Sequence, residues 1–445
     1  MLRNFLIFLY CLWCHSFLTN GQDVLFLDFN EAISIGLENN VDVLKANNEL
    51  TALDATKQEA IMVFLPNLSA NVRAARQEGQ QFQLVEDGFE ISNVQADRLS
   101  GGIDAQLSIF EGFSKIHQYS SSELDRRAQQ NGVNRSKQVL VFNIAQAYLQ
   151  ILLDKELLSI AQQNVNNQQE QLKRIEGLVE AGIRPQADLF SQRATLKQLE
   201  LEEIEAKNTY LLDKAGFSSL LQLEPFTVFE LQSVENEQLV GSELQSLESL
   251  YQTALISRYD LKQQQLITES SNLSIRRTRA AIYPSLFAFY SYGTQFSSLN
   301  DLSFRDQLFD LYPNNTVGLS LNIPIFSNFI NKAAITRAKV TYNNNELDRQ
   351  NLRRTIYEEV QNAYLNYTAA QQRVQVSTTA ETAAEEAFSI QNERYNEGLA
   401  NISELAIANQ AYYDAQSGKK QAVYAAISQK IILSYQVGTL EFEEM

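Results

Sequence analysis

The chain is poor in the residues that most catalytic and metal sites require. Its 445 residues contain only two cysteines and two histidines. Cys11 and Cys14 both lie in a leader segment that we expect to be removed, so thiol and disulfide chemistry is excluded from the mature chain. His117 is then the only histidine, which excludes Ser-His triads and histidine metal clusters. The sequence therefore predicts no enzyme, no cofactor and no metal site.

Basic surfaces and long apolar runs are also missing. The formal net charge is -17, and lysines and arginines are scattered singly along the chain. A nucleic-acid partner is excluded, because such a partner requires a basic stripe with interleaved aromatic residues. No segment after residue 21 has eighteen consecutive apolar residues, so the mature chain is predicted to lack a transmembrane helix.

The first residues read as a secretory signal peptide. Arg3 precedes an apolar run over residues 5–13, and a polar stretch ends at Gly21. This pattern predicts a signal peptide over residues 1–21, with cleavage after Gly21. Lipidation of Cys14 is an alternative, although Trp13 stands where a lipoprotein signal needs a small residue.

Proline is sparse, and its positions divide the chain into segments. None of the prolines interrupts a long helical pattern, which favours continuous helices between them. The six prolines all fall at joints between predicted segments: Pro66, Pro185, Pro225, Pro284, Pro313 and Pro324.

The chain carries one pattern twice. The triplet Ala-Tyr-Leu at residues 147–149 recurs 216 residues later at residues 363–365, and Gly182 recurs at the same offset as Gly398. Pro66 is matched by Pro284, 218 residues later. Landmarks in the same order at nearly constant spacing establish an internal duplication, which decides the fold class before any single motif does.

Each copy is predicted to run helix, strand pair, long helix, glycine turn and long helix. The first repeat spans residues 22–222 and the second 243–436, with a linker over 223–242 and a tail over 437–445. Alternating apolar residues predict strands at about 67–83, 95–110, 285–297 and 315–326.

The longest helical patterns, near residues 114–180 and 330–397, would each extend about 100 Å. Each ends at a glycine and restarts as a second helix, which predicts antiparallel coiled-coil hairpins. Many apolar positions of these hairpins are alanine, which allows close helix packing around a hollow centre. A solid coiled-coil stalk is the alternative. The strands have one apolar face, but four strands are too few to close a pore, so closure requires several chains.

These features together resemble the TolC-like outer-membrane efflux proteins. The resemblance covers essentially the whole mature chain, including the turns at residues 180–183 and 397–399. It implies a homotrimer in which the strands form a twelve-stranded β-barrel in outer-membrane lipid and the hairpins form an α-barrel in the periplasm. The function implied is passive export of small molecules or proteins, in a tripartite efflux or type I secretion system with a periplasmic adaptor and an inner-membrane transporter.

The resemblance also assigns roles to the glycine turns. It implies that the turns form the periplasmic tip and contact the adaptor, through Gly182, Ile183, Arg184, Gly398, Leu399 and Ala400. A glycine suits such a reversal because it adopts positive φ without strain. Ile183 and Leu399 would be either exposed apolar contacts or packing residues inside the turns.

A pore gate is implied close to the same turns. Glu404 matches a position that lines the pore as a ring, and Asp188 matches one that hydrogen-bonds a tyrosine, here Tyr395. The family arginine and a second acid are replaced by Ala400 and Ile407. Three carboxylates about 6 Å apart repel by roughly 2.8 kcal/mol per pair at a dielectric constant near 20. We therefore expect cation selectivity and pH-dependent conductance.

Two other functions fit parts of the sequence. A periplasmic adaptor has a coiled-coil hairpin but no duplicated apolar strand pairs, and a structural coiled-coil stalk needs no strands. Drug efflux, metal efflux and protein secretion remain open as cargo classes, because all three use this scaffold.

Overall fold

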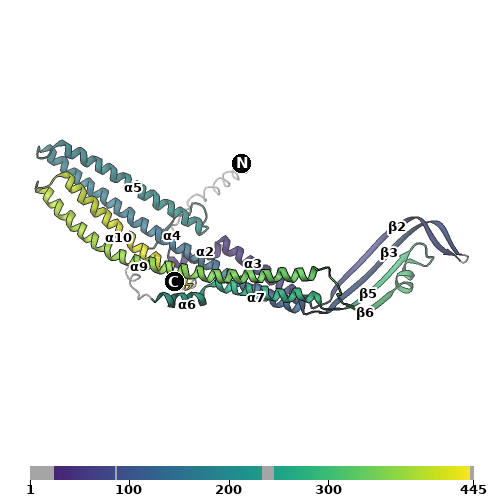
Figure 1. Cartoon of the computed structure of the whole chain (residues 1–445). Coiled ribbons are helices and arrows are strands. Elements are labelled where there is room, and N and C mark those ends of the chain that lie inside the picture. The colour runs from purple at the N-terminus through teal and green to yellow at the C-terminus, as the bar shows by residue number, and fades with distance from the viewer. Residues whose placement is uncertain (1–24, 86–87, 233–244, 441–445) are drawn as a thin grey trace, which may run out of the picture. The chain divides into compact units, whose positions relative to one another are not determined.

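The computed structural model describes residues 25–85, 88–232 and 245–440 (Figure 1). The predicted signal peptide, part of the predicted linker and the last five residues lie outside the described residues. Among the described residues, no helix combines the length and the apolar character needed to cross a membrane.

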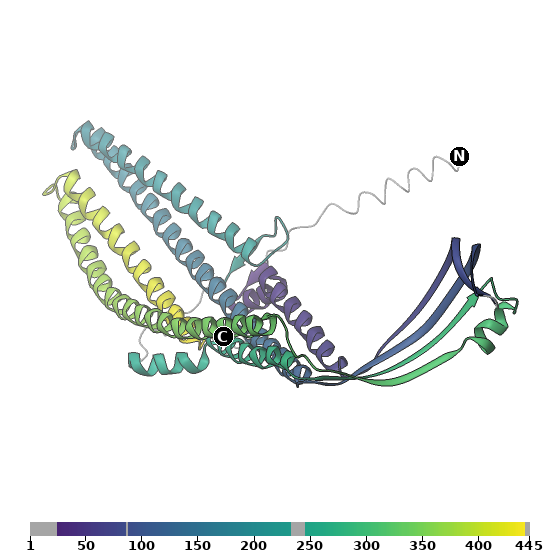
Figure 2. The same ribbon diagram turned by 45° about the vertical axis from the view of Figure 1, so that its right-hand side comes forward.

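The duplication is confirmed element by element. The first copy contains α2 (Phe29–Asn39), α3 (Val41–Met62), β2 (Asn67–Val85), β3 (Gly88–Glu111), α4 (Ser114–Glu180) and α5 (Gln186–Leu220). The second contains α6 (Leu247–Ser257), α7 (Tyr259–Arg279), β5 (Ser285–Ser297), β6 (Asn314–Asn322), α9 (Ile330–Asn396) and α10 (Ile402–Val437). Helices α4 and α9 each have 67 residues, and each is followed by an antiparallel partner helix (Figures 1 and 2).

Each copy begins with two helices where the sequence predicted one. Asn40 ends α2 and Arg258 ends α6, both in an extended conformation with ψ near 124°. The next residue starts a new helix in each case, so the chain bends at equivalent places in the two copies. Neither break has a proline or a glycine, so the apolar periodicity continues across it.

The strands also differ in length from their predicted ranges. The first hairpin is longer than expected, because β2 and β3 remain paired up to Val85 and Gly88. Strand β6 is shorter and ends at Asn322, because Pro324 lacks the N–H group that continued pairing would need. Between β5 and β6 lie a short helix, α8 (Phe304–Asp306), and a single π-helical turn, η3 (Gln307–Leu311).

The described residues form two compact units that do not follow the boundary between the repeats. Unit 1 is drawn from the ranges Met1–Asn47, Gly132–Leu261 and Leu352–Met445. Unit 2 is drawn from Asn48–Asn131 and Lys262–Asn351. Both units contain segments of both copies, because elements of one copy pair with elements of the other.

Unit 2 contains a four-stranded antiparallel sheet in the order β2-β3-β5-β6. Strands β3 and β5 join the two copies, with Gly102 opposite Gly293. The outer strands β2 and β6 have no further partner strand in the part of the chain that the structure describes.

The two faces of this sheet differ in chemistry. On one face the Asp104 carboxylate accepts hydrogen bonds from Asn71 Nδ2 (3.0 Å) and Ser291 Oγ (2.7 Å), which links three strands. The other face is apolar and largely exposed to solvent in the single chain. Its most exposed large apolar residues are Val317 (81%), Val72 (77%), Leu68 (69%) and Leu319 (69%).

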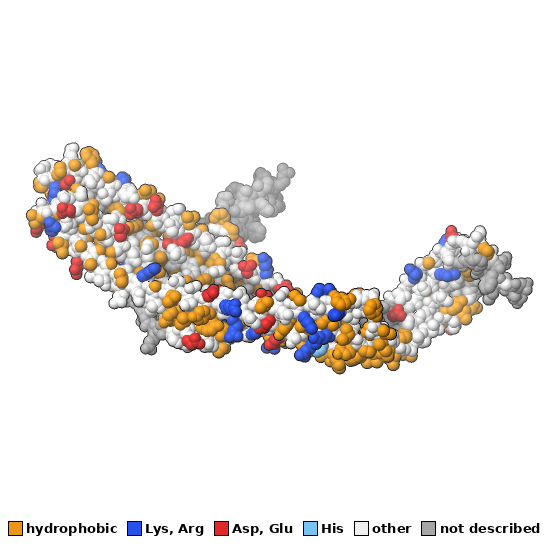
Figure 3. Space-filling model, in the orientation of Figure 1, with side chains coloured by type: hydrophobic (Ala, Val, Ile, Leu, Met, Phe, Trp, Pro, Cys, Tyr) orange, Lys and Arg blue, Asp and Glu red, His pale blue; other side chains and the backbone are white. Residues whose placement is uncertain are grey.

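Exposed apolar side chains also gather where the strands of unit 2 meet its helices (Figure 3). The first junction contributes Phe113, and the second contributes Ile325, Phe326 and Phe329, with Tyr283 between β5 and the helix before it. Lys332 Nζ lies 5.1 Å from the centre of the Phe329 ring. Phe113 and Phe329 stand at equivalent positions and both have positive φ (67° and 68°).

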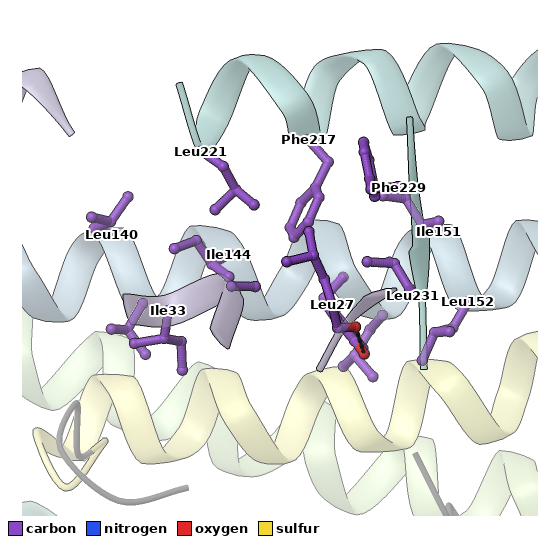
Figure 4. Packing of buried hydrophobic residues seen from close by; sticks show 14 of the residues in the cluster. Leu27, Ile33, Leu140, Ile144, Ile151, Leu152, Phe217, Leu221, Phe229 and Leu231 are labelled. Atoms are coloured by element: carbon purple, nitrogen blue, oxygen red, sulfur yellow. Dashed lines mark hydrogen bonds between the residues drawn. The ribbon is translucent and has the colours of Figure 1, made fainter. Parts of the chain in front are cut away.

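The core of unit 1 surrounds a two-stranded parallel sheet made by β1 (Leu25–Leu27) and β4 (Phe229–Leu231). Apolar residues of α2, α4, α5 and α10 pack on it (Figure 4): Ile33, Leu140, Ile144, Ile151, Leu152, Phe217, Leu221 and Ile427. The Tyr148 hydroxyl donates to the main-chain oxygen of Gln232 (2.8 Å), and its burial raises the pKa of that hydroxyl to about 12. The tyrosine thus fixes the end of β4 to helix α4.

Candidate functional site at the hairpin turns

The two helix-to-helix turns of unit 1 have the same backbone geometry. Gly182 and Gly398 have φ of 73° and 80°. The next residue in each turn, Ile183 or Leu399, donates its N–H to the carbonyl five residues before it (2.9 and 2.8 Å). The pattern is that of a Schellman motif, which satisfies the last carbonyls of the outgoing helix. A positive φ is unfavourable for a residue with a Cβ atom, so glycine is the favoured residue at both positions.

The return helices begin differently. Pro185 caps α5 without a side-chain hydrogen bond, whereas the Asn401 side chain accepts from the Glu404 N–H in α10 (2.9 Å). Asp188 and Glu404 occupy the same place in the first turn of their helices. A carboxylate there is stabilised by the positive end of the helix dipole.

Glu404 is exposed, and its carboxylate is held by two amides. Asn401 Nδ2 donates to Glu404 Oε1 (2.9 Å), and Gln391 Nε2 from the opposite helix α9 donates to Oε2 (2.8 Å). The carboxylate therefore has a fixed position and keeps lone pairs free for solvent or ions. Ile407, one turn further along α10, is 71% exposed.

Arg184 and Tyr395 connect the two turns. The Arg184 guanidinium carbon lies 4.5 Å from the centre of the Tyr395 ring, and Nη2 donates to the main-chain oxygen of Tyr395 (2.9 Å). Tyr395 is buried and lies in the last turn of α9. The stacked cation and the hydrogen bond hold the first turn against the second.

The hydrogen bond expected between Asp188 and Tyr395 is not formed. Within the described residues, the Tyr395 hydroxyl is buried without a hydrogen-bond partner. Burial raises the pKa of this hydroxyl, the Arg184 cation lowers it, and the nearby Asp188 charge raises it. Arg184 stacks on the ring and Asp188 acts only through its charge, so the pairing implied by the resemblance is wrong in this chain.

An apolar cluster packs the two turns together and separates the predicted tip residues into two groups. Ile175 of α4 meets Tyr395, Ala400, Ile402 and Leu405 of the second hairpin. Ala400 is 7% exposed, so its side chain belongs to this core and cannot contact a partner. Ile183 and Leu399 are 67% and 65% exposed, which agrees with exposed apolar contacts and not with packing inside the turns.

Sequence reasoning missed two members of this site, Gln391 and the partnership of Arg184. The sequence did contain a signal for the role of Arg184. Arg184 follows Gly182 by two residues, as Ala400 follows Gly398, so it is the equivalent of the position where the family has its arginine. The contact between Arg184 and Tyr395 joins two different hairpins, so residue spacing within one hairpin does not predict it. Gln391 gave no such signal, because glutamine is frequent on these helices.

A known family matches both copies. The model of the family described as "Outer membrane efflux protein" matches residues 32–221 and 250–438. Each match covers one structural copy, from its first helix to the end of its hairpin.

Individual proteins agree with this match. The chain is 24% identical over 325 residues to the proteases secretion protein PrtF of Dickeya chrysanthemi, covering 72% of this chain and 68% of that protein. It is 21% identical over 365 residues to the outer membrane protein TolC of Escherichia coli, covering 81% and 73% of the two chains. The crystal structure of the Campylobacter jejuni CmeC outer membrane channel has a TM-score of 0.79 at 16% identity and covers 94% of this chain and 87% of that one. That likeness demonstrates the same fold.

Proposed function

Because the chain belongs to the outer membrane efflux protein family, we propose that three identical chains assemble into one channel that docks a periplasmic adaptor. The protein belongs to the outer membrane, and its role is export. Three sheets of four strands close a barrel of twelve strands, and the hairpins continue it as a tunnel in the periplasm. Cargo passes without chemical change.

The observation that carries this proposal is the open sheet of unit 2. Its outer strands, β2 and β6, lack partner strands among the described residues, and its apolar face is exposed. Lipid supplies no hydrogen bonds to a strand edge, so a sheet can enter a membrane only when its edges are paired. Pairing β2 of one chain with β6 of the neighbouring chain satisfies both edges and directs the apolar face to lipid. A periplasmic adaptor or a coiled-coil stalk would leave this sheet unexplained.

The exposed aromatic residues at the strand-to-helix junctions support a membrane boundary there. Aromatic rings are enriched where a membrane meets water, and lysines beside them reach the polar headgroups. Phe113, Phe326, Phe329 and Lys332 have this composition at one end of the sheet. The helices that follow these junctions would then begin in the periplasm.

The hairpin turns support the docking and gating parts of the proposal. Ile183 and Leu399 are exposed apolar side chains on rigid turns, which suits contact with an adaptor. Glu404 supplies a carboxylate for a ring at the pore, and Arg184 with Tyr395 supplies the contact that keeps the two turns of each chain together. Asp188 adds negative charge beside that contact. Opening would separate Arg184 from Tyr395.

Engineered cysteines test the assembly, since the two natural cysteines lie in the predicted signal peptide. One cysteine is placed on β2 (Ser69→Cys, Asn71→Cys or Arg73→Cys) and one on β6 (Thr316→Cys, Gly318→Cys or Ser320→Cys). At least one combination is expected to give covalent trimers in outer membranes under oxidation. A matched control pairs Asn71→Cys with Gly293→Cys of β5, which β3 separates from β2 within the chain and which lies at no edge. Monomers from every combination would refute the closed trimer.

A further inference from the structure

Helix α4 carries a carboxyl group that is buried with one oxygen unsatisfied. The Asp154 side chain is 4% exposed. Its Oδ1 accepts a hydrogen bond from Gln150 Nε2 (2.9 Å), but Oδ2 has no donor among the described residues. A buried charged oxygen without a partner is costly, so Asp154 needs either a cation or a proton.

The group that faces Asp154 is a second carboxyl, Asp213 of helix α5. Asp213 is close enough to act as a side-chain hydrogen-bond partner of Asp154. Asp154 is buried and Asp213 is partly buried, and Ile151, Leu152 and Phe217 of the same two helices belong to the core of unit 1 (Figure 4). Two carboxylates cannot donate to each other, so a hydrogen bond between them requires one proton.

The other charged groups on the neighbouring elements are engaged elsewhere. Lys214 of α5 pairs with Glu230 of β4 (2.9 Å), and Lys420 of α10 pairs with Glu156 of α4 (2.9 Å). Lys155 is exposed. Among the described residues, neither Asp154 nor Asp213 makes a salt bridge, and no set of three metal-ligating side chains occurs. A proton is therefore the ligand that this pair fits.

The second copy does not repeat the pair. The residues 216 positions later are Ala370, which is buried, and Gln429, whose side-chain oxygen is buried without a partner within the described residues. The duplicated scaffold thus folds without these carboxyls, so the fold does not require them. The pair is a property of the first hairpin alone.

We propose that Asp154 and Asp213 form a proton-binding latch between the two helices of the first hairpin. One proton shared by the carboxyls joins α4 to α5 at acidic pH. Loss of that proton leaves two facing negative charges, of which the one on Asp154 is buried, and the helices separate locally.

The direction of the pH dependence follows from the titration. Burial, and next the hydrogen bond with Asp213, raise the pKa of Asp154 from 3.8 to about 7. A carboxyl whose folded pKa is raised stabilises the fold fully below its unfolded pKa and loses that contribution as the pH rises through the folded value. The latch is therefore closed near pH 5 and open near pH 8.

Hydrogen–deuterium exchange on the purified full chain in detergent tests the latch. Between pH 5 and pH 8, amides at 150–157 and 209–217 are expected to lose protection by about tenfold or more, after correction for the intrinsic exchange rate. Amides at 366–373 and 425–433 of the second hairpin are the internal reference and should not change. Asp154→Asn should abolish the pH dependence, because an asparagine amide donates to Asp213 at every pH. Asp213→Asn should do the same and serves if the first variant folds poorly.

The control variant is Asp414→Asn on α10. Asp414 also accepts a hydrogen bond from a glutamine one turn before it, Gln410 (2.9 Å), but it is exposed. The pH dependence should persist in this variant. Equal protection at pH 5 and pH 8 in the natural chain would overturn the latch, as would a pH dependence that survives both Asp154→Asn and Asp213→Asn. Protection at pH 8 that Ca²⁺ restores and a chelator removes would assign the pair to metal binding instead.

Discussion

Arg184 stacks on the ring of Tyr395, with the guanidinium carbon 4.5 Å from the ring centre, and donates to the main-chain oxygen of the same residue. This contact joins the first hairpin turn to the last turn of α9. The TolC-like resemblance implies an arginine in the second turn, where this chain has Ala400. In this chain Tyr395 still contacts an arginine, but that arginine, Arg184, comes from the first copy and not from the second.

Replacing Arg184 should loosen the closed arrangement of the turns. Arg184→Ala removes a partly buried stacking contact and a hydrogen bond, together about 1 to 2 kcal/mol, which is roughly a tenfold gain in the open population. We expect higher single-channel conductance or longer openings in planar bilayers. Arg184→Lys should lie between the two, because a lysine keeps the charge and loses the planar stacking.

Arg394→Ala is the matched control, since Arg394 is an exposed arginine in the same turn of α9, and its Nη1 donates to the side-chain oxygen of Gln391 (3.2 Å). It should leave conductance near that of the natural protein. An equal effect of the two variants would show that the loss of any positive charge near the turns opens the channel.

The charge of Glu404 should set ion selectivity. Glu404→Gln removes the charge and keeps a side chain that can still bond Asn401 at the helix start. We expect the ratio of cation to anion permeability, measured from reversal potentials, to fall toward one. Glu397→Gln removes an exposed charge from the adjacent turn and should change this ratio little. Unchanged selectivity in Glu404→Gln would remove Glu404 from the pore.

The exposed apolar side chains of the turns should matter for export and not for the channel itself. Ile183→Ser and Leu399→Ser each remove apolar contact area, and the double variant should lower export at least tenfold when adaptor docking depends on both. Trimer yield and bilayer conductance should be unchanged. Ala181→Ser changes the same turn without removing a large apolar group, and its export should stay normal. Loss of conductance in Ile183→Ser would indicate a defect in the fold instead.

A side chain at either turn glycine should destabilise the fold, for a reason of backbone conformation. Apart from the adjacent residues of the chain, no atom lies within 4 Å of a methyl group added at Gly182 or Gly398, so crowding is absent. Alanine at a positive φ nevertheless costs about 1 kcal/mol, and the thermal midpoint should fall by a few degrees. Gly177→Ala is the opposite control, because Gly177 is a helical glycine with equally open surroundings and alanine there should raise the midpoint. A fall of the midpoint in Gly177→Ala would contradict this explanation.

Much of the secondary structure could be predicted because it depends on local patterns. For example, α3 ends within a few residues of Pro66, and α4 ends within a few residues of Gly182. The breaks at Asn40 and Arg258 were not predicted. At the first break a local signal exists, because the Asn40 side chain accepts from the N–H groups of Asp42 (3.0 Å) and Val43 (3.2 Å) and so caps α3. At the second break, Arg258 is 2% exposed and pairs with Asp260 and Glu359, so contacts distant in sequence contribute to the bend.

The repeat predicted which residues occupy equivalent positions in the two copies, but it did not predict how deeply each residue is buried. Tyr148 and Tyr364 are equivalent in sequence, but Tyr148 is 1% exposed in the core of unit 1 and Tyr364 lies at the margin of a different cluster. Leu149 is 7% exposed, and its equivalent Leu365 is 55% exposed. Identical residues at the same spacing therefore form the same helix in both copies. The elements that pack against each helix decide which of its faces is buried.

The amino-acid sequence by itself determined the duplication, the order of the strand pairs and long helices within each copy, and the two glycine turns, because helix period, strand alternation and glycine conformation are local properties of the chain. Only the tertiary structure decided that Arg184 meets Tyr395, that Ala400 is buried while Ile183 and Leu399 are exposed, and that Asp154 faces Asp213. These relationships join residues on different helices. Their energies depend on burial and on the separation of charges, and neither quantity exists until the helices have packed.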